Sequence, residues 1–468
     1  YCSFMPVPIF VTNEDAGEQT EEIPEEEVTE KDTVLDTFIK DAVTEEVEKE
    51  DGTKETVEKV PAKKMAKIVK RPVAINDIHP LWTKHPNECS DEDYKEFYRK
   101  VFHDYKEPLF WIHLNMDYPF NLKGILYFPK INTEYESIEG TIKLYNNQVF
   151  VADNIKEVIP EFLLLLKGVI DCPDLPLNVS RSALQNDGFV KKISDYITKK
   201  VADKLSGMCK TDKENYEKYW DDINPFIKFG VLKDEKFAEK MNDYIIFKNL
   251  EGKYLTLKEC LEENKEKHEN TVFYVTDEVE QSQYINMFKN EGIDAVILTH
   301  NIDQPFITNM ESKNENLKFK RIDADLSDSF KEETSKDELK DMTEKLSKTF
   351  KDALGKENLT VNVEKLKDAS ISSMITLSEE SRRMQDMMKM YGMAGMDPNM
   401  FGAEGQTLVL NANNDLVKYV AEHTDGENTK IICEQLYDLA MLSHAPLSPE
   451  QMTGFIARSN KIMELLAK

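Results

Sequence analysis

Apolar residues recur at two different spacings along the chain, and the two spacings predict different elements. Short apolar runs bounded by turn residues, at 108–114, 124–129 and 142–153, predict strands. After Gly188, apolar residues recur every four positions, as on the buried stripe of an amphipathic helix: Phe189, Ile193, Ile197, Val201 and Leu205. This part of the chain is therefore predicted to be mixed α/β.

A smaller unit is predicted near residues 271–300. The run TVFYVT at 271–276 and the run AVILT at 295–299 are typical of strands. Between them Tyr284, Met287 and Phe288 mark one face of a helix, and Gly292 provides its end. Strand, helix and strand over this length predict a βαβ unit.

The last region begins near Ser335, where Ser335 and Glu338 fit a capping box. A helix is predicted after it, with Gly355 at its C-terminus and one apolar face, formed by Leu339, Met342, Leu346 and Phe350. Two strands are predicted next, at 359–363 and 407–411.

Two helices with narrow apolar faces are predicted at the end of the sequence. The faces contain Ile432, Leu436 and Leu439 on the first, and Phe455, Ile456, Ser459, Ile462, Met463 and Leu466 on the second. Two such helices cannot bury these faces by themselves. Pairing with a second copy would form a four-helix bundle, which predicts a homodimer. The alternative is that the helices pack back onto their own domain.

The first seventy residues differ from the rest in charge. Residues 1–12 are apolar and strand-like, but Pro6 and Pro8 argue against a central strand, and no partner is evident nearby. From Asn13 to Val60 there are nineteen Asp and Glu against five Lys and Arg, a net charge of −14 and half of the chain total of −28. This acidic tract predicts a disordered or weakly ordered linker. A basic segment follows at 61–71.

Composition and motifs exclude several classes of protein. A chain of 468 residues predicts several domains, and its acidity argues against nucleic-acid binding. The six cysteines form no CxxC pair and the eight histidines no HExxH motif, so neither a zinc framework nor a metalloprotease is indicated. The sequence also contains no GxSxG, no GxxxxGK[ST] and no GxGxxG. A self-contained nucleotide site is therefore not expected.

Arg181 remains a candidate for chemistry in the stretch LPLNVSRSALQ at 175–185. Pro176 stiffens the loop, and Asn178 or Ser180 can cap the next helix. Arg181 would then be aimed from a helix start, with Gln185 one turn later on the same face. A guanidinium held in this way can stabilise a transferring phosphoryl group that another domain binds. The alternative is a structural ion pair with one of the many carboxylates.

Two further stretches are candidates for binding. The segment 384–400 holds seven methionines, and Met384, Met387, Met388 and Tyr391 share a face at helical spacing. Flexible methionine side chains can adapt to varied apolar partners, although the same pattern also fits ordinary core. Trp82 lies between prolines in HPLWTKHP, either as an exposed contact point or as a buried anchor at the edge of a domain.

Taken together, these stretches resemble the heat-shock protein 90 chaperone family, in particular its bacterial high-temperature protein G type. The resemblance covers about 78–468 and is carried by PLWTKHP, DEDYKEFYRKVFHDYKEPL, GILYFP, PEFLLLLKGVIDCPDLPLNVSRSALQ, the βαβ unit and the methionine and closing-helix region. It implies an α/β and α+β multidomain fold. The implied parts are the last strand of a nucleotide domain (1–12), a charged linker (13–70), an αβα middle domain (71–240) with a smaller βαβ part (241–334), and a client-binding, dimerising C-terminal domain (335–468).

The resemblance also implies function. It implies a cytoplasmic, homodimeric chaperone that binds non-native client proteins, and possibly other chaperones, and hydrolyses ATP with magnesium. This chain would bind no cofactor or metal of its own and would be inactive alone, because the family binds ATP in a preceding domain. A passive dimeric client-holding scaffold without ATP coupling is the alternative.

Site residues follow by position from the same resemblance. Arg181 matches the arginine that reaches the ATP γ-phosphate, and Gln185 matches its companion. Client contact falls on Trp82, Phe306, Met384, Met387, Met388, Met390 and Tyr391. Two departures are visible: Asn147 and Gln148 replace basic residues of many relatives, and Gln304 and Pro305 replace a glutamate and an aromatic.

Overall fold

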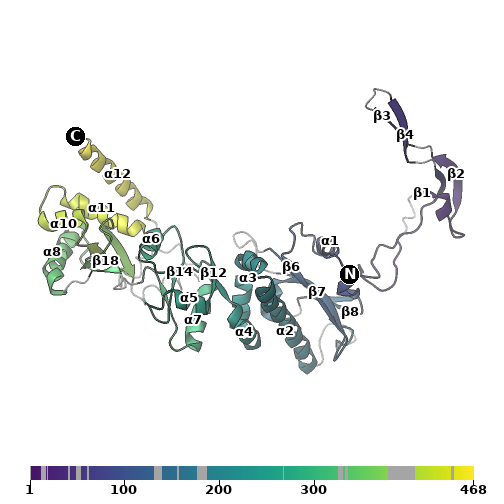
Figure 1. Ribbon diagram of the computed structural model, residues 1–468, viewed down its shortest axis with the longest axis horizontal. Coiled ribbons are helices and arrows are strands. Elements are labelled where there is room, and N and C mark those ends of the chain that lie inside the picture. Colours follow the sequence, from purple (N-terminus) through teal and green to yellow (C-terminus); the bar gives the residue numbers. More distant parts are fainter. Residues whose placement is uncertain are drawn as a thin grey trace. The chain divides into compact units, whose positions relative to one another are not determined.

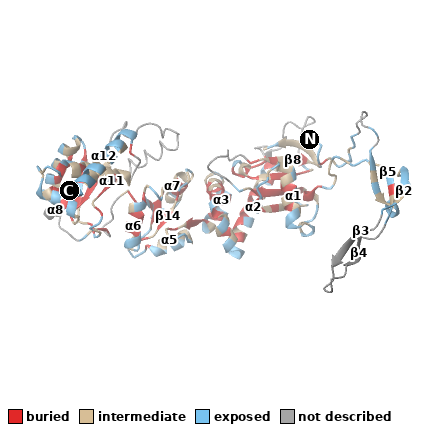
Figure 2. Cartoon of the chain, turned by 90° about the horizontal axis from the view of Figure 1, so that it is seen from above, coloured by how far each residue is buried: buried red, intermediate tan, exposed pale blue. Residues whose placement is uncertain are grey.

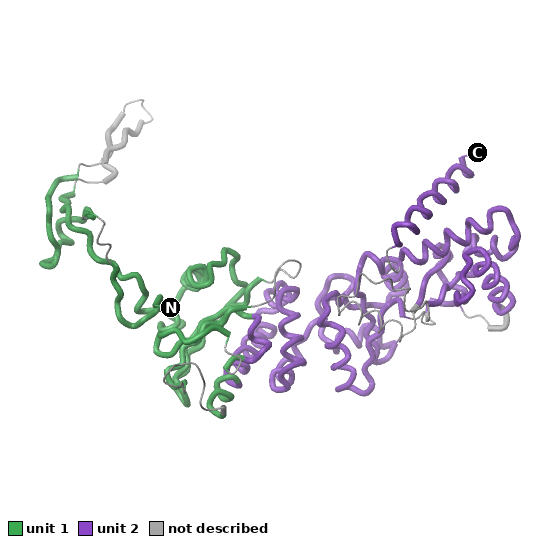
Figure 3. The backbone as a smooth tube through the Cα atoms, turned by 180° about the vertical axis from the view of Figure 1, so that it is seen from behind, with its two compact units in different colours: residues 1–130, 139–159, 166–194 green, residues 131–138, 160–165, 195–468 purple. Residues whose placement is uncertain are grey.

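The structure is a computed structural model (Figure 1), and its description covers the following residues: 2–11, 17, 19–40, 43–48, 54–60, 63–130, 140–154, 158–175, 187–266, 268–324, 330–332, 336–377, 406–443 and 447–467. The chain forms two compact units, which Figure 3 colours separately. Unit 1 contains 1–130, 139–159 and 166–194, and unit 2 contains 131–138, 160–165 and 195–468. Each unit is mixed α/β.

The described part of the acidic tract forms strands, so the prediction that it is disordered or weakly ordered is wrong, while its role as a linker stays a prediction. β1 (Thr20–Pro24) and β2 (Val34–Lys40) flank β5 (Lys63–Val69) in an antiparallel sheet, and β3 (Val43–Glu48) pairs with β4 (Lys54–Val60) in a hairpin. The basic segment supplies the central strand β5, between the acidic β1 and β2, whose one Asp and one Lys balance. Arg71 lies 2.6 Å from Asp32, and this guanidinium holds the pKa of Asp32 well below its ordinary value.

The main sheet of unit 1 confirms the predicted strands. It contains β6 (Phe110–Met116), β7 (Leu122–Phe128), β8 (Ile142–Asn146), β9 (Val149–Asp153) and β10 (Lys167–Asp171) in the order β6-β7-β10-β8-β9. Only β8 and β10 pair in parallel; the other neighbours are antiparallel. Helix α1 (Asp91–Phe102) starts at a Ser90 capping box and buries Tyr94, Phe97 and Tyr98.

The predicted long helix is α2 (Asp187–Thr211), in which Ile193, Ile197, Val201 and Leu205 are fully buried. In unit 2, α3 (Lys213–Lys233) packs against α4 (Glu235–Met241) and the 3₁₀ helix η4 (Glu161–Leu165). Gly230 allows this close approach, because a Cβ there would lie 2.6 Å from the ring of Phe237.

The predicted βαβ unit is confirmed and continues for one more helix and strand. β13 (Thr271–Val275), α6 (Ser282–Asn290) and β14 (Ala295–Ile297) are followed by α7 (Asp303–Lys313) and β15 (Lys318–Arg321). The strands form a parallel sheet in the order β14-β13-β15. Beside them lie the hairpin β11 (Ile246–Lys248) and β12 (Tyr254–Thr256) and the short helix α5 (Leu257–Glu263).

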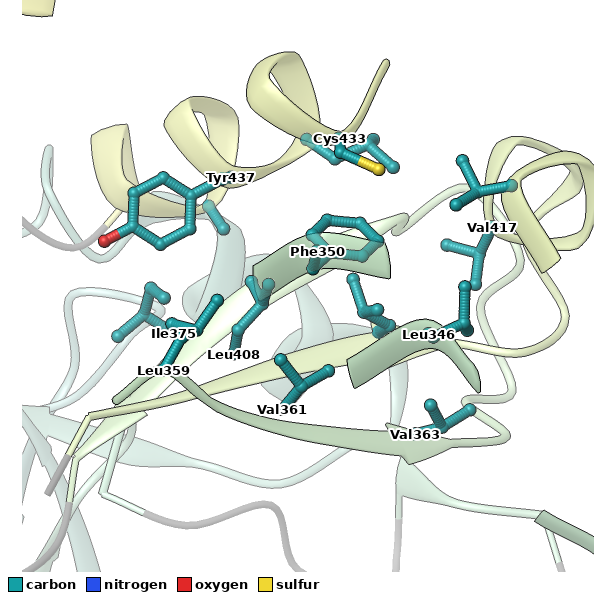
Figure 4. Close-up of a cluster of buried hydrophobic side chains, with 14 of the residues drawn as sticks. Leu346, Phe350, Leu359, Val361, Val363, Ile375, Leu408, Val417, Cys433 and Tyr437 are labelled. Carbon is teal, nitrogen blue, oxygen red and sulfur yellow. The ribbon is translucent and has the colours of Figure 1, made fainter. Parts of the chain in front are cut away.

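The C-terminal part is a three-stranded sheet covered by helices. Its strands β16 (Thr360–Glu364), β18 (Gln406–Asn411) and β17 (Ser373–Leu377) stand in that order. The helices of its core are α8 (Lys336–Leu354), α10 (Asp415–Glu422) and α11 (Thr429–Leu442), and α12 (Pro449–Leu466) packs against α11. Figure 4 shows Leu346 and Phe350 of α8 in the core between helices and sheet, as their spacing predicts. β17 was not predicted.

Burial follows these elements, with buried residues on strands and on the inner faces of helices (Figure 2). No helix within the described ranges is long and apolar enough to cross a membrane.

Candidate functional site

Several candidate residues lie outside the described residues. Arg181 and Gln185 fall in the undescribed residues between β10 and α2. A second undescribed range, between β17 and β18, contains Met384, Met387, Met388, Met390 and Tyr391. The flanks of the Arg181 stretch are described: Leu175 and Val190 are both buried in unit 1. The stretch is therefore held at both ends by the core, while the roles of Arg181 and Gln185 stay predictions.

Trp82 is a buried anchor rather than an exposed contact point. It lies in the 3₁₀ helix η2 (Leu81–Thr83) and is fully buried, which contradicts the exposed alternative. Its ring centroid lies 5.2 Å from that of Tyr145, 5.7 Å from Phe97 and 4.7 Å from Phe4. A side chain enclosed in this way cannot touch a client protein unless the cluster opens.

The indole N–H of Trp82 donates a hydrogen bond to Asp171 at the end of β10, over 3.2 Å. The same carboxylate oxygen accepts the backbone N–H of Gln148 at 2.9 Å. Burial raises the pKa of Asp171, and these hydrogen bonds oppose that shift. Asp171 thus joins η2 to the turn between β8 and β9.

Asn147 and Gln148 form this turn with φ of 52° and 62°. Both residues adopt the left-handed conformation that two-residue hairpin turns require. With its side-chain amide oriented so that nitrogen faces the carbonyls, Gln148 donates to Phe4 O at 3.0 Å and Ile78 O at 3.2 Å. The Gln148 side chain therefore links the turn between β8 and β9 to the backbone of Phe4 and Ile78.

The first residues of the chain have a partner, contrary to the expectation from sequence, and they form no regular strand. Phe4 is buried in the aromatic cluster of Trp82, and Ser3 O accepts the backbone N–H of Asp77 at 2.8 Å. The Asn76 side chain accepts from Ile9 N at 2.7 Å and donates to Met5 O and Val7 O at 2.8 Å each. Hydrogen bonds therefore join residues 3–9, which precede the acidic tract, to residues 76–77, which follow it.

Phe306 is also fully buried, so a direct client contact by this side chain is not supported. It lies in α7 beneath the ammonium group of Lys228, which is 5.7 Å from the ring centroid. Lys228 of α3 forms an ion pair with Asp303, and both side chains are buried. The second carboxylate oxygen of Asp303 accepts the backbone N–H of His300 at 2.9 Å. This group of side chains joins α3 to α7.

The apolar faces of α11 and α12, the two last helices, differ in how far they are buried. Leu436 is buried in the C-terminal core and is therefore not available for the predicted dimer interface, whereas Ile432 packs against this core and is half-buried. Leu439, Ile456, Met463 and Leu466 are exposed, while Phe455 and Ile462 are half-buried. No side chain of α12 is buried by the described part of the chain.

Arg458 fastens α12 to α11. Its guanidinium donates to Glu434 at 3.1 Å, to Gln435 at 3.0 Å and to Asp438. Burial raises the pKa of Asp438, and the charge of Arg458 opposes the shift. Gln435 also donates to Ser459 at 3.1 Å, so part of the predicted apolar face of α12 lies against α11, while Ile456, Met463 and Leu466 are exposed.

Comparison with known proteins identifies the family. The model of the Hsp90 protein family matches residues 1–468. The chain is 42% identical over 366 residues to Chaperone protein HtpG of Bacteroides thetaiotaomicron, which covers 75% of this chain and 53% of that protein. It is 43% identical over 367 residues to Chaperone protein HtpG of Bacteroides fragilis strain YCH46, with the same coverage of both chains. It is 41% identical over 362 residues to Chaperone protein HtpG of Porphyromonas gingivalis strain ATCC 33277, and this match covers 74% of this chain and 52% of that protein.

The chain belongs to the Hsp90 family, and these relatives indicate its bacterial HtpG type. It spans about half the length of the curated relatives that it matches. The sequence motifs identified the family correctly. They did not reveal the pairs Trp82–Asp171 and Lys228–Asp303, because each pair joins positions far apart in sequence with no fixed spacing.

Proposed function

We propose that this chain is a client-binding and dimerising part of an ATP-dependent molecular chaperone. The observation that carries the proposal is membership of the Hsp90 family together with relatives that are named chaperones. The exposed apolar face of α12 supports the dimer, because a second copy could cover it with the same face. Non-native polypeptides are the proposed substrates, and the methionine-rich segment 384–400 is the proposed contact.

The client contact is tested by the aggregation of a chemically unfolded protein, followed by light scattering. The chain should suppress aggregation, and Met387→Ser with Met390→Ser should weaken suppression, because polar side chains bury less apolar area against the client. The matched control is Met387→Leu with Met390→Leu, which keeps the apolar surface and should keep the activity. Equal suppression by the serine and leucine variants would remove these methionines from the client site.

The coupling to ATP is a second part of the proposal, and it rests on Arg181. We propose that its guanidinium stabilises the phosphoryl group during transfer when a nucleotide domain of the family binds ATP. In a chain joined to such a domain, Arg181→Ala should reduce ATP turnover by about 10³-fold or more and leave nucleotide affinity nearly unchanged. Unchanged turnover would make Arg181 structural and would favour the passive client-holding scaffold.

A further inference from the structure

A pocket of about 660 Å³ lies within unit 1. It is lined by the first residues of the chain, by the end of α1 and by the antiparallel pair β8 and β9. Small-ligand pockets in proteins measure about 300–1,000 Å³. The pocket is therefore large enough for a small molecule with one or two rings, or for the last residue of a peptide.

Aromatic side chains from three segments line this pocket. Phe4 and Tyr145 are at most 5% exposed, and their ring centroids lie 5.8 Å apart. Phe150 of β9 lines the pocket beside them, with its centroid 5.7 Å from that of Tyr145. Because aromatic rings pack against one another at such spacings, this lining favours a planar aromatic group.

The hydroxyl of Tyr145 is a donor without an acceptor. It makes no hydrogen bond with any residue that the structure describes, although the side chain as a whole is buried. The oxygen is not among the polar atoms that the protein encloses completely, so it faces the open space that Tyr145 lines. Burial raises the pKa of Tyr145, and the hydroxyl therefore stays protonated at neutral pH. A ligand that brings an acceptor to this hydroxyl would be favoured.

Two ammonium groups in the lining are also free to donate. Lys143 lies 3.7 Å from Asp153, and Lys100 lies 3.7 Å from Asp77, which is too far for a hydrogen bond in either pair. With His103 neutral, the charged lining residues are Lys100, Lys143 and Asp153, two positive charges against one negative charge. The pocket thus has an excess of donors and a formal charge of +1, which favours a monoanion.

From these observations we infer that the pocket binds an aromatic carboxylate. The ring of this ligand would lie against Phe4 and Phe150, and its carboxylate would accept hydrogen bonds from the Tyr145 hydroxyl and from Lys143. The Lys143 ammonium group lies 6.0 Å from the centroid of the Phe150 ring, so a charged donor and an aromatic surface are adjacent in the lining. The inference goes beyond the proposed chaperone function and does not depend on it.

The pocket is tested with 2-naphthoate, and with 2-naphthamide as its neutral isostere. Calorimetric titration of the full chain should show one site for 2-naphthoate and at least about tenfold weaker binding of 2-naphthamide, because the amide lacks the charge. The backbone N–H of Asp77, which donates to Ser3 O at 2.8 Å, should exchange more slowly with 2-naphthoate bound, because the ligand holds the neighbouring Phe4 in place. Equal affinities for the two compounds, or no binding of either, would overturn the inference.

Tyr145→Phe is the sharpest variant, because it keeps the ring and removes only a hydroxyl that has no partner among the described residues. The Kd for 2-naphthoate should rise about tenfold, and the thermal unfolding midpoint should stay close to that of the parent. The matched control is Tyr105→Phe, at a tyrosine that is 91% exposed and does not line the pocket, and its Kd should stay within about twofold of the parent. Equal Kd values in the two variants would contradict the inference.

A pair of charge variants tests the sign of the recognised group. Lys143→Gln should raise the Kd for 2-naphthoate about fivefold, because one cation is lost from a partly exposed site. Asp153→Asn should lower the Kd, because the carboxylate that competes for Lys143 is removed. Weaker binding by Asp153→Asn would show that the pocket does not recognise the ligand as an anion.

The aromatic carboxylate can be a free small molecule or the end of a polypeptide, and a short peptide that ends in phenylalanine separates the two sources. If the peptide binds with a free C-terminus and not with an amidated one, and Tyr145→Phe weakens this binding, polypeptide ends are ligands of the pocket. If 2-naphthoate binds and neither peptide does, the ligand is a free small molecule. Equal binding of the free and the amidated peptide would count against recognition of the carboxylate.

Discussion

The indole nitrogen of Trp82 donates to a carboxylate oxygen of Asp171 over 3.2 Å, and both side chains are buried although they are 89 positions apart in sequence. The bond ties η2 to the end of β10, directly before the stretch that contains Arg181. Trp82 is therefore part of the scaffold that carries the proposed catalytic loop. A substitution of Asp171 should therefore change the stability of both η2 and the end of β10.

Asp171→Ala should destabilise this scaffold, because it leaves the indole N–H and the Gln148 N–H without an acceptor. The expected loss is roughly 2 kcal/mol in the free energy of local opening, since relief of the buried carboxylate offsets part of the cost of two unpaired donors. Hydrogen exchange of the β10 amides measures it. Asp153→Ala is the control, because the ion pair of Asp153 with Lys143 is half-exposed and should contribute less than about 1 kcal/mol. Equal losses in the two variants would show that Asp171 has no special role.

Lys228→Met should open the contact between α3 and α7. It removes the cation from a buried pair and leaves the Asp303 carboxylate uncompensated, which costs about 3–5 kcal/mol. The increase in hydrogen exchange should be concentrated in α7. Lys236→Met provides the comparison, because its pair with Asp195 lies at the surface and should matter by less than about 1 kcal/mol. If α7 exchanges no faster in Lys228→Met than in this control, the buried pair does not hold the contact.

His113 should make unit 1 less stable in mild acid. Its Nδ1 is hydrogen-bonded to the Tyr94 hydroxyl at 2.8 Å, and Nε2 is buried. Burial lowers the pKa of His113 below its ordinary value of 6.5. The unfolded chain then binds a proton more readily than the folded chain, so stability is complete above pH 6.5 and is lost as the pH falls toward the lowered folded pKa.

This pH dependence is measured by comparing the parent chain with His113→Gln, which keeps a polar side chain but cannot titrate. Hydrogen exchange of the β6 amides at pH 7.5 and pH 5.5, corrected for intrinsic exchange rates, gives the free energy of opening at each pH. The parent should lose stability between the two pH values, and the variant should lose less. Identical slopes would mean that His113 does not contribute.

Local patterns in the sequence were sufficient for elements whose periodicity is long and regular. The four-residue spacing from Ile193 to Leu205 predicted α2. The βαβ unit was predicted from two strand-like runs, a helix face between them and Gly292 as the helix end, and Gly292 has a φ of 62° in the structure. The acidic tract was misjudged because charge composition hides strand pairing: β1 and β2 are acceptable strands once the basic β5 lies between them. Composition averages over the tract and cannot show which strands will meet.

The candidate site was predictable only where a family motif exists. Motifs led to Arg181 and to the methionine segment, and both lie outside the described residues. Trp82 and Phe306 were expected to contact clients, but both are buried, because an aromatic residue in a short motif gives no information about what covers it. Leu436 likewise lies in the domain core, whereas Leu439 of α11 and Ile456, Met463 and Leu466 of α12 are exposed.

The apolar face of α12 predicts how two copies meet. Leu466 is 83% exposed, and Ile456 and Met463 are more than half exposed. Ile456→Ser with Met463→Ser should weaken dimerisation by at least about tenfold, because less apolar area is removed from water at the interface. The control is Lys461→Ser, an exposed polar position on the same helix, which should leave the dimer intact.

The most direct measurement is sedimentation velocity of the chain at micromolar concentration with a fluorescently labelled unfolded protein. We predict that the chain sediments as a dimer, that the labelled protein moves with it, and that Ile456→Ser with Met463→Ser converts the dimer to monomer. A chain that sediments as a monomer, while the labelled protein remains in the slow fraction, would contradict its assignment as a client-binding, dimerising part of an Hsp90 chaperone.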